Sequence, residues 1–110
     1  MALDGVALSG FVADETGSPR GGAIVSVRKL TGEPFNGSSR TDQRGHYAFP
    51  KLPDGEYSVE ATLEGFDTVL YKPVRIYFPA EVQRSFVLSV IYLGTEGGVY
   101  ASSQLVGELV

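Results

Sequence analysis

Hydrophobic and polar residues alternate along several short stretches of the chain, which is the pattern of β-strands with one buried face. The alternation is clearest over residues 56–64, and it recurs over residues 6–13 and 23–28. The apolar faces of these stretches comprise Val6, Leu8 and Val12; Ala23, Val25 and Val27; and Tyr57, Val59, Ala61 and Leu63. We therefore expect three strands whose apolar side chains point into a shared core.

Weaker patterns predict the remaining strands. Residues 38–41 suggest a short strand before a turn at 42–45, after which Tyr47 and Phe49 should point inward. The Gly65–Phe66 dipeptide should turn the chain into a strand at 67–71, and Pro73 restricts the next residues to a sheet edge or a bend. Residues 82–88 form the last predicted strand.

These strands define the expected domain. About seven strands with turn signals every 8–12 residues and no helical periodicity predict an all-β fold, a seven-stranded Greek-key β-sandwich. We place it at residues 1–90 and treat 91–110 as a C-terminal extension. This extension is either an extra edge strand or the start of a following repeat, because residues 8–12 and 105–109 share the pattern Leu-x-Gly-x-aliphatic.

The segment from Tyr47 to Val59 predicts a strand, a tight corner and a second strand. Pro53 fixes its own φ, and Gly55 can adopt a positive φ without steric cost. Tyr57 follows two residues later, and its hydroxyl can return to the corner backbone as in the tyrosine corner of Greek-key sandwiches.

Composition narrows the function classes. The chain has 110 residues, a formal charge of −4 and no cysteine, so disulfides, thiol catalysis and thiolate metal sites are excluded. The nine basic residues are scattered, which disfavours nucleic-acid binding. No apolar run approaches a membrane span, and the N-terminus lacks the pattern of a signal peptide.

The order of turn and core residues resembles the carboxypeptidase regulatory-like domain family, a transthyretin-like (prealbumin-like) sandwich. The matching positions are Gly10, Val12, Asp14, Gly17, Pro19, Gly22, Ala23, Val25, Val27, Thr41, Gly45, Tyr47, Phe49, Leu52, Pro53, Gly55, Tyr57, Val59, Gly65 and Phe66. The resemblance implies a non-catalytic accessory module of larger bacterial surface, secreted or outer-membrane-associated proteins, and therefore an extracytoplasmic location.

Related sandwiches with chemistry of their own do not fit these residues. Hydroxyisourate hydrolases need several histidines, and intradiol dioxygenases need two His and two Tyr on iron, whereas His46 is the single histidine here. Isopeptide-forming adhesins need Lys in the first strand and Asn in the last, but the first lysine is Lys29 and the one asparagine is Asn36. We therefore expect no enzyme activity and no cofactor.

Candidate polar sites are better explained as surface or turn residues. His46 should point outward and has no catalytic partner. Asp14, Glu15, Asp42 and Asp54 could offer oxygen ligands to a hard cation, but their spacing matches no calcium loop, so turn formation is the preferred interpretation and no metal is predicted. Glu56, Glu60 and Glu64 form an acidic stripe that is expected to be a solvated sheet face.

A contact surface is the most informative remaining hypothesis. Possible members are the aromatic residues of the second half and the outward-facing Phe11 and Ile24, namely Phe11, Ile24, Tyr71, Tyr77, Phe78, Tyr92 and Tyr100. We expect the partner to be a neighbouring domain or protein chain, with a homodimer through a C-terminal edge strand as one form and glycan binding by exposed rings as the alternative. Neither nucleic acid nor membrane insertion is expected.

Overall fold

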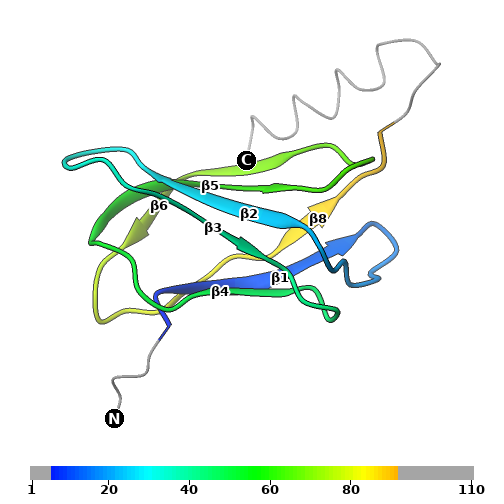
Figure 1. Ribbon diagram of the computed structural model, residues 1–110, viewed down its shortest axis with the longest axis horizontal. Coiled ribbons are helices and arrows are strands. Elements are labelled where there is room, and N and C mark those ends of the chain that lie inside the picture. The colour runs from blue at the N-terminus through cyan, green and yellow to red at the C-terminus, as the bar shows by residue number, and fades with distance from the viewer. Residues whose placement is uncertain (1–5, 92–110) are drawn as a thin grey trace.

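The computed structural model describes residues 6–91, which form eight β-strands in two facing sheets (Figure 1). The strands are β1 (Leu8–Asp14), β2 (Ile24–Lys29), β3 (Asn36–Arg40), β4 (His46–Phe49), β5 (Gly55–Thr62), β6 (Val69–Ile76), β7 (Val82–Gln83) and β8 (Phe86–Leu88). Within this part of the chain there is no helix of the length and apolarity that a membrane crossing requires.

One sheet has the order β4-β1-β7, with β8 also paired to β1, and the other has the order β3-β2-β5-β6. Strand β1 runs antiparallel to β4 but parallel to β7 and β8. The predicted all-β sandwich is confirmed, with eight strands in place of seven. The predicted extension at 91–110 lies outside the described residues, apart from Ile91.

The extra strand arises because the predicted strand at 82–88 is interrupted at Arg84 and Ser85. The backbone carbonyl of Arg84 accepts a hydrogen bond from the Tyr47 hydroxyl at 2.5 Å instead of one from β1. The Phe11 amide of β1 donates at 3.3 Å to the Ser85 hydroxyl. The Arg84 amide still donates to the Ser9 carbonyl at 2.9 Å, and two side chains replace the next backbone bonds between β1 and this segment.

Strand β6 is longer than the predicted 67–71 because it continues through Pro73. It is an edge strand, as Pro73 predicted. Tyr57 of β5 pairs with Val74, and Val59 pairs with Tyr71, so Lys72 and Pro73 together face a single residue of β5. This β-bulge accommodates a proline because the residues at the bulge lack regular ladder hydrogen bonds.

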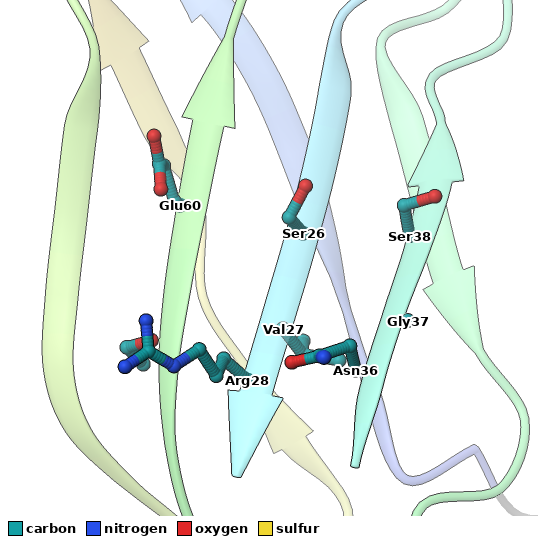
Figure 2. A pocket seen from close by; sticks show the side chains of 8 residues that line it. Ser26, Val27, Arg28, Asn36, Gly37, Ser38 and Glu60 are labelled. Carbon is teal, nitrogen blue, oxygen red and sulfur yellow. The ribbon is translucent and has the colours of Figure 1, made fainter. Parts of the chain in front are cut away.

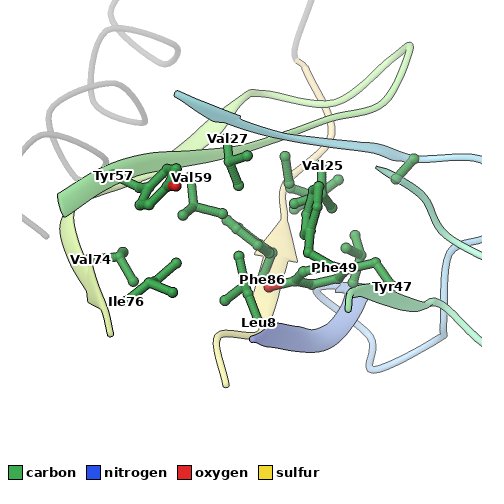
Figure 3. Packing of buried hydrophobic residues seen from close by; sticks show 14 residues of the cluster. Leu8, Val25, Val27, Tyr47, Phe49, Tyr57, Val59, Val74, Ile76 and Phe86 are labelled. Atoms are coloured by element: carbon green, nitrogen blue, oxygen red, sulfur yellow. The ribbon is translucent and has the colours of Figure 1, made fainter. Parts of the chain in front are cut away.

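The core lies between the sheets and takes side chains from both (Figure 3). The inward faces predicted for β2 and β5 are confirmed, since Ala23, Val25, Val27, Tyr57, Val59 and Ala61 are all buried. Tyr47 and Phe49 of β4 also point inward as predicted. Their rings contact each other edge to face, with centroids 6.1 Å apart.

The corner between β4 and β5 is a tyrosine corner, as predicted. The Tyr57 hydroxyl donates to the Pro53 carbonyl at 2.6 Å, and Gly55 has a φ of +156°. Burial raises the pKa of Tyr57, so its hydroxyl remains a neutral donor at ordinary pH.

Gly10→Ala should destabilise the domain severely, because a Cβ atom at residue 10 would lie 1.8 Å from the Arg84 carbonyl oxygen. We expect the free energy of unfolding, measured by urea denaturation, to fall by about 3 kcal/mol. Gly37→Ala in β3 is the matched control, because its Cβ would meet only ordinary contacts, the nearest at 3.4 Å. Equal losses in the two variants would contradict the close approach of Arg84 to Gly10.

Tyr57→Phe should lower the free energy of unfolding by about 1–3 kcal/mol, because it leaves a part-buried carbonyl without its donor. Tyr77→Phe removes a hydroxyl from a side chain that is 47% exposed and serves as the control. A loss within error for Tyr57→Phe would remove the argument that the hydroxyl holds the corner.

Candidate functional site

An apolar groove lies at the end of the sandwich where β1 begins. It has a volume of about 990 Å³, within the size range of ligand sites. The loops β2–β3, β4–β5 and β6–β7 meet at this end (Figure 1). The lining residues are Val6, Ala7, Phe35, Pro50, Lys51, Leu52, Pro53, Ile76, Phe78, Pro79, Ala80 and Glu81. We call this feature the end groove.

The tyrosine corner builds one wall of the end groove. Pro53, whose carbonyl is held by Tyr57, lines the groove beside Leu52. The Tyr57 ring also contacts Phe35 edge to face, with centroids 6.4 Å apart. One buried tyrosine therefore positions lining residues from two different loops.

The opposite wall is fixed to the same corner. The Phe78 amide donates to the Asp54 carboxylate at 2.8 Å, so the loop after β6 is tied to the loop before β5. The Phe78 side chain is itself 84% exposed at the groove. The hydrogen bond therefore fixes the backbone of Phe78 while its large apolar ring remains exposed to solvent. The predicted contact residue Phe78 therefore belongs to the end groove.

A second hollow, of about 480 Å³, lies on the outer face of the β3-β2-β5 sheet (Figure 2). In cross-strand register, Ser38, Ser26 and Glu60 form one row, and Asn36, Arg28 and Ser58 form the next. Its lining is polar, with three serines, Asn36, Arg28 and Glu60 beside Val27 and Gly37. Glu60 of the predicted acidic stripe lies here, whereas Glu56 is paired with Arg75 at 3.3 Å.

Asp14 and Asp42, two of the candidate metal ligands, accept hydrogen bonds from their own loops, whereas Asp54 accepts the Phe78 amide of another loop. The Asp14 carboxylate accepts hydrogen bonds from the Thr16 amide and hydroxyl, the Ser18 amide and the Arg20 guanidinium, which lies 2.7 Å away. Arg20 in turn lies over the Phe66 ring, 5.1 Å from its centroid. No group of three or more acidic or histidine side chains suited to a metal occurs within residues 6–91.

Asp42 plays the same part in the turn before β4. Its carboxylate accepts the backbone amides of Arg44 and His46, both at 2.9 Å. These hydrogen bonds, above all the one from His46, hold the pKa of Asp42 below its ordinary value. The turn-forming interpretation of both aspartates agrees with this geometry.

The other predicted contact residues are dispersed. Phe11 lies in β1, in the sheet opposite the one drawn in Figure 2. It is 53% exposed and packs against His46, with ring centroids 5.1 Å apart. Ile24 is half-buried, and the Tyr71 hydroxyl donates internally to the Ser85 carbonyl at 2.6 Å. Tyr92 and Tyr100 lie outside the described residues. Of the predicted contact residues that the structure describes, Phe78 alone lines the end groove.

The sequence reasoning missed most of the groove lining. Phe35, Pro79 and Ala80 were assigned no role, and Leu52 and Pro53 were assigned only a structural one. Their shared signal is local: each lies in a loop rich in proline or glycine next to a predicted strand. Only the sandwich topology brings these loops to one end.

Asp14→Asn should destabilise the domain in a pH-dependent way. Hydrogen bonds from Thr16, and next from Arg20, hold the pKa of Asp14 well below its ordinary value. Because the pKa is lower in the folded state, the ionised carboxylate stabilises the fold at every pH above the unfolded-state pKa of about 4. This stabilisation is lost as the pH falls through the folded-state pKa. The melting temperature of Asp14→Asn should therefore lie below wild type at pH 7 and approach it in acid.

Glu33→Gln, at an exposed position in the β2–β3 loop, removes the same charge and should leave the melting temperature nearly unchanged at every pH. A pH-independent deficit in Asp14→Asn would contradict the role of its ionised carboxylate.

The family model described as Carboxypeptidase regulatory-like domain matches residues 7–89. No curated protein sequence matches the chain. Among solved structures, the chain is similar to chlorocatechol 1,2-dioxygenase from Pseudomonas putida, with 17% identity and a TM-score of 0.54 over 74% of this chain and 58% of that chain.

A chain of the type II Cohesin-X-Dockerin complex from Acetivibrio cellulolyticus is also similar, with 20% identity and a TM-score of 0.59 over 84% of this chain and 64% of that chain. (S)-allantoin synthase has 17% identity and a TM-score of 0.58 over 78% of this chain and 41% of that chain. The present chain spans less than two thirds of each of these structures, and at such identities the similarity shows the fold alone. The family match extends over most of the chain and includes the corner and core residues described above, and the chain therefore belongs to the carboxypeptidase regulatory-like domain family.

Proposed function

We propose that the domain is a non-catalytic interaction module, and that its end groove binds an apolar segment of a neighbouring domain or of another protein chain. The observation that carries this proposal is the Phe78 ring, which is 84% exposed beside a groove lined mainly by aliphatic residues, aromatic residues and prolines. An exposed apolar surface of this kind, rimmed by charged residues such as Lys51 and Glu81, is typical of protein-binding sites.

The groove has the rigidity that binding requires. Pro50, Pro53 and Pro79 restrict its backbone, and the bonds from Tyr57 to Pro53 and from Phe78 to Asp54 connect its walls. A preorganised surface loses little conformational entropy on binding. Covering the Phe78 ring would contribute about 1.5–3 kcal/mol, so this residue is the expected centre of the contact.

A catalytic role has little chemical support. The sequence has one histidine and no cysteine, and the His46 ring packs against Phe11. The carboxylates of Asp14 and Asp42 are occupied by donors of their own loops. The proposal is therefore of a binding domain.

The proposed setting is a larger bacterial protein at the cell surface, in the periplasm or secreted, and family membership is what supports it. A sandwich of this fold also occurs in a Cohesin-X-Dockerin complex, so the fold is compatible with protein assembly. Glycan binding by exposed rings has less support, because Tyr71 uses its hydroxyl within the domain.

Phe78→Ser should weaken binding of apolar peptides about ten- to hundredfold, because it removes the ring expected at the centre of the contact. Peptides selected from a displayed random library would be titrated against the isotope-labelled chain, and the affinity and the shifted amide signals measured by NMR. We expect the shifts to cluster on Leu52, Phe78 and Ala80.

Phe11→Ser removes an exposed ring from the middle of β1, outside the groove lining, and should leave the peptide affinity unchanged. Selection of no apolar peptide, or equal weakening by the two variants, would overturn the assignment of binding to the end groove.

A further inference from the structure

The end groove carries one charge of each sign on opposite sides of β1. The Ala7 amide donates to the Pro50 carbonyl at 3.3 Å, and the Val82 amide donates to the Ala7 carbonyl at 3.0 Å. Lys51 therefore lies on the β4 side of Ala7, directly after Pro50, and Glu81 precedes Val82 on the β7 side. With neighbouring strands about 4.8 Å apart, the two backbones are separated by roughly 10 Å.

Both charged side chains are available to a partner. Lys51 and Glu81 are exposed, and the two ion pairs among residues 6–91 join other side chains, Arg20 with Asp14 and Arg75 with Glu56. The apolar part of the groove lies between the two charges, because Val6 and Ala7 line it as well. This arrangement of an apolar centre with opposite charges at its two margins is self-complementary.

We infer that the partner of the end groove is a second copy of this chain, docked end to end about a two-fold axis near Ala7. This inference rests on the proposed function, in which the end groove is a protein-binding site. The axis is perpendicular to the sheet of β4, β1 and β7, so the rotation exchanges the two sides of β1 and Lys51 of each copy faces Glu81 of the other. The same operation brings each Phe78 ring to the apolar groove of the other copy. A two-fold interface requires this reciprocity, in which one surface serves both partners.

The sheet edge at β6 is a poorer site for self-association. Lys72, Pro73 and the β-bulge there disrupt the ladder that a second chain would have to extend, and these are recognised devices against edge pairing. End-to-end docking needs no free strand edge. It therefore differs from the edge-strand dimer that the sequence suggested, whose C-terminal strand lies outside the described residues.

Sedimentation equilibrium of the full chain over a wide concentration range tests the inference by charge exchange. Wild type should dimerise, and Lys51→Glu and Glu81→Lys should each raise the dissociation constant by at least about tenfold, because like charges then face each other. The double variant K51E/E81K should restore the wild-type value, since the opposite charges meet again with their places exchanged. Higher salt should weaken the wild-type dimer.

Arg40→Glu and Glu64→Lys are the matched controls, because they make the same changes in net charge at exposed positions outside the groove. They should leave the dissociation constant unchanged. A wild type that stays monomeric, or a double variant that fails to recover, would overturn the inference. If apolar peptides still bind the monomer in a Phe78-dependent manner, the groove remains a protein-binding site and only the identity of its partner is wrong.

Discussion

The close approach of the Arg84 carbonyl to Gly10 joins the first strand of the fold, β1, to its last segment, β7–β8. No side chain fits between them, because even a Cβ atom on residue 10 would overlap the carbonyl oxygen. Tyr47 completes the contact from the core with its hydroxyl bond to the same oxygen, and burial raises the pKa of that hydroxyl so that it stays protonated. The pairing of β7 and β8 with β1 depends on this contact. It gives a physical reason for finding glycine and tyrosine at these two positions of the family pattern.

The second constraint is the corner before β5, where one motif both stabilises the turn and forms part of the end groove. Leu52, Pro53 and Tyr57 belong to the family pattern, and a purely architectural account of them would be sufficient. However, the same residues form or support one wall of the end groove, and Asp54 ties the opposite wall to them. The groove is therefore as rigid as the corner, and substitutions in the corner act on stability and on the surface together.

Local patterns were enough to predict much of the fold. Alternation identified the buried faces of β2 and β5, and the spacing of Pro53, Gly55 and Tyr57 identified the corner, because these features depend on residues close in sequence. The interruption at Arg84 was not predictable, since it depends on Tyr47, a residue far along the chain. The end groove was missed for the same reason, because three separate loops supply its lining. Tyr71 appeared to be a surface ring because its hydroxyl partner, Ser85, is set by the tertiary packing.

The parallel pairing of the first and last strands has a mechanical consequence. Because β1 and β8 run in the same direction, the chain enters the sandwich at one end and leaves it at the other (Figure 1). Tension applied between residues 6 and 91 would therefore pull β1 and the β7–β8 segment in opposite directions along their length. Their hydrogen bonds would be loaded together in shear instead of being opened one at a time, as in a pulled hairpin. A domain with this strand pairing would resist extension between residues 6 and 91.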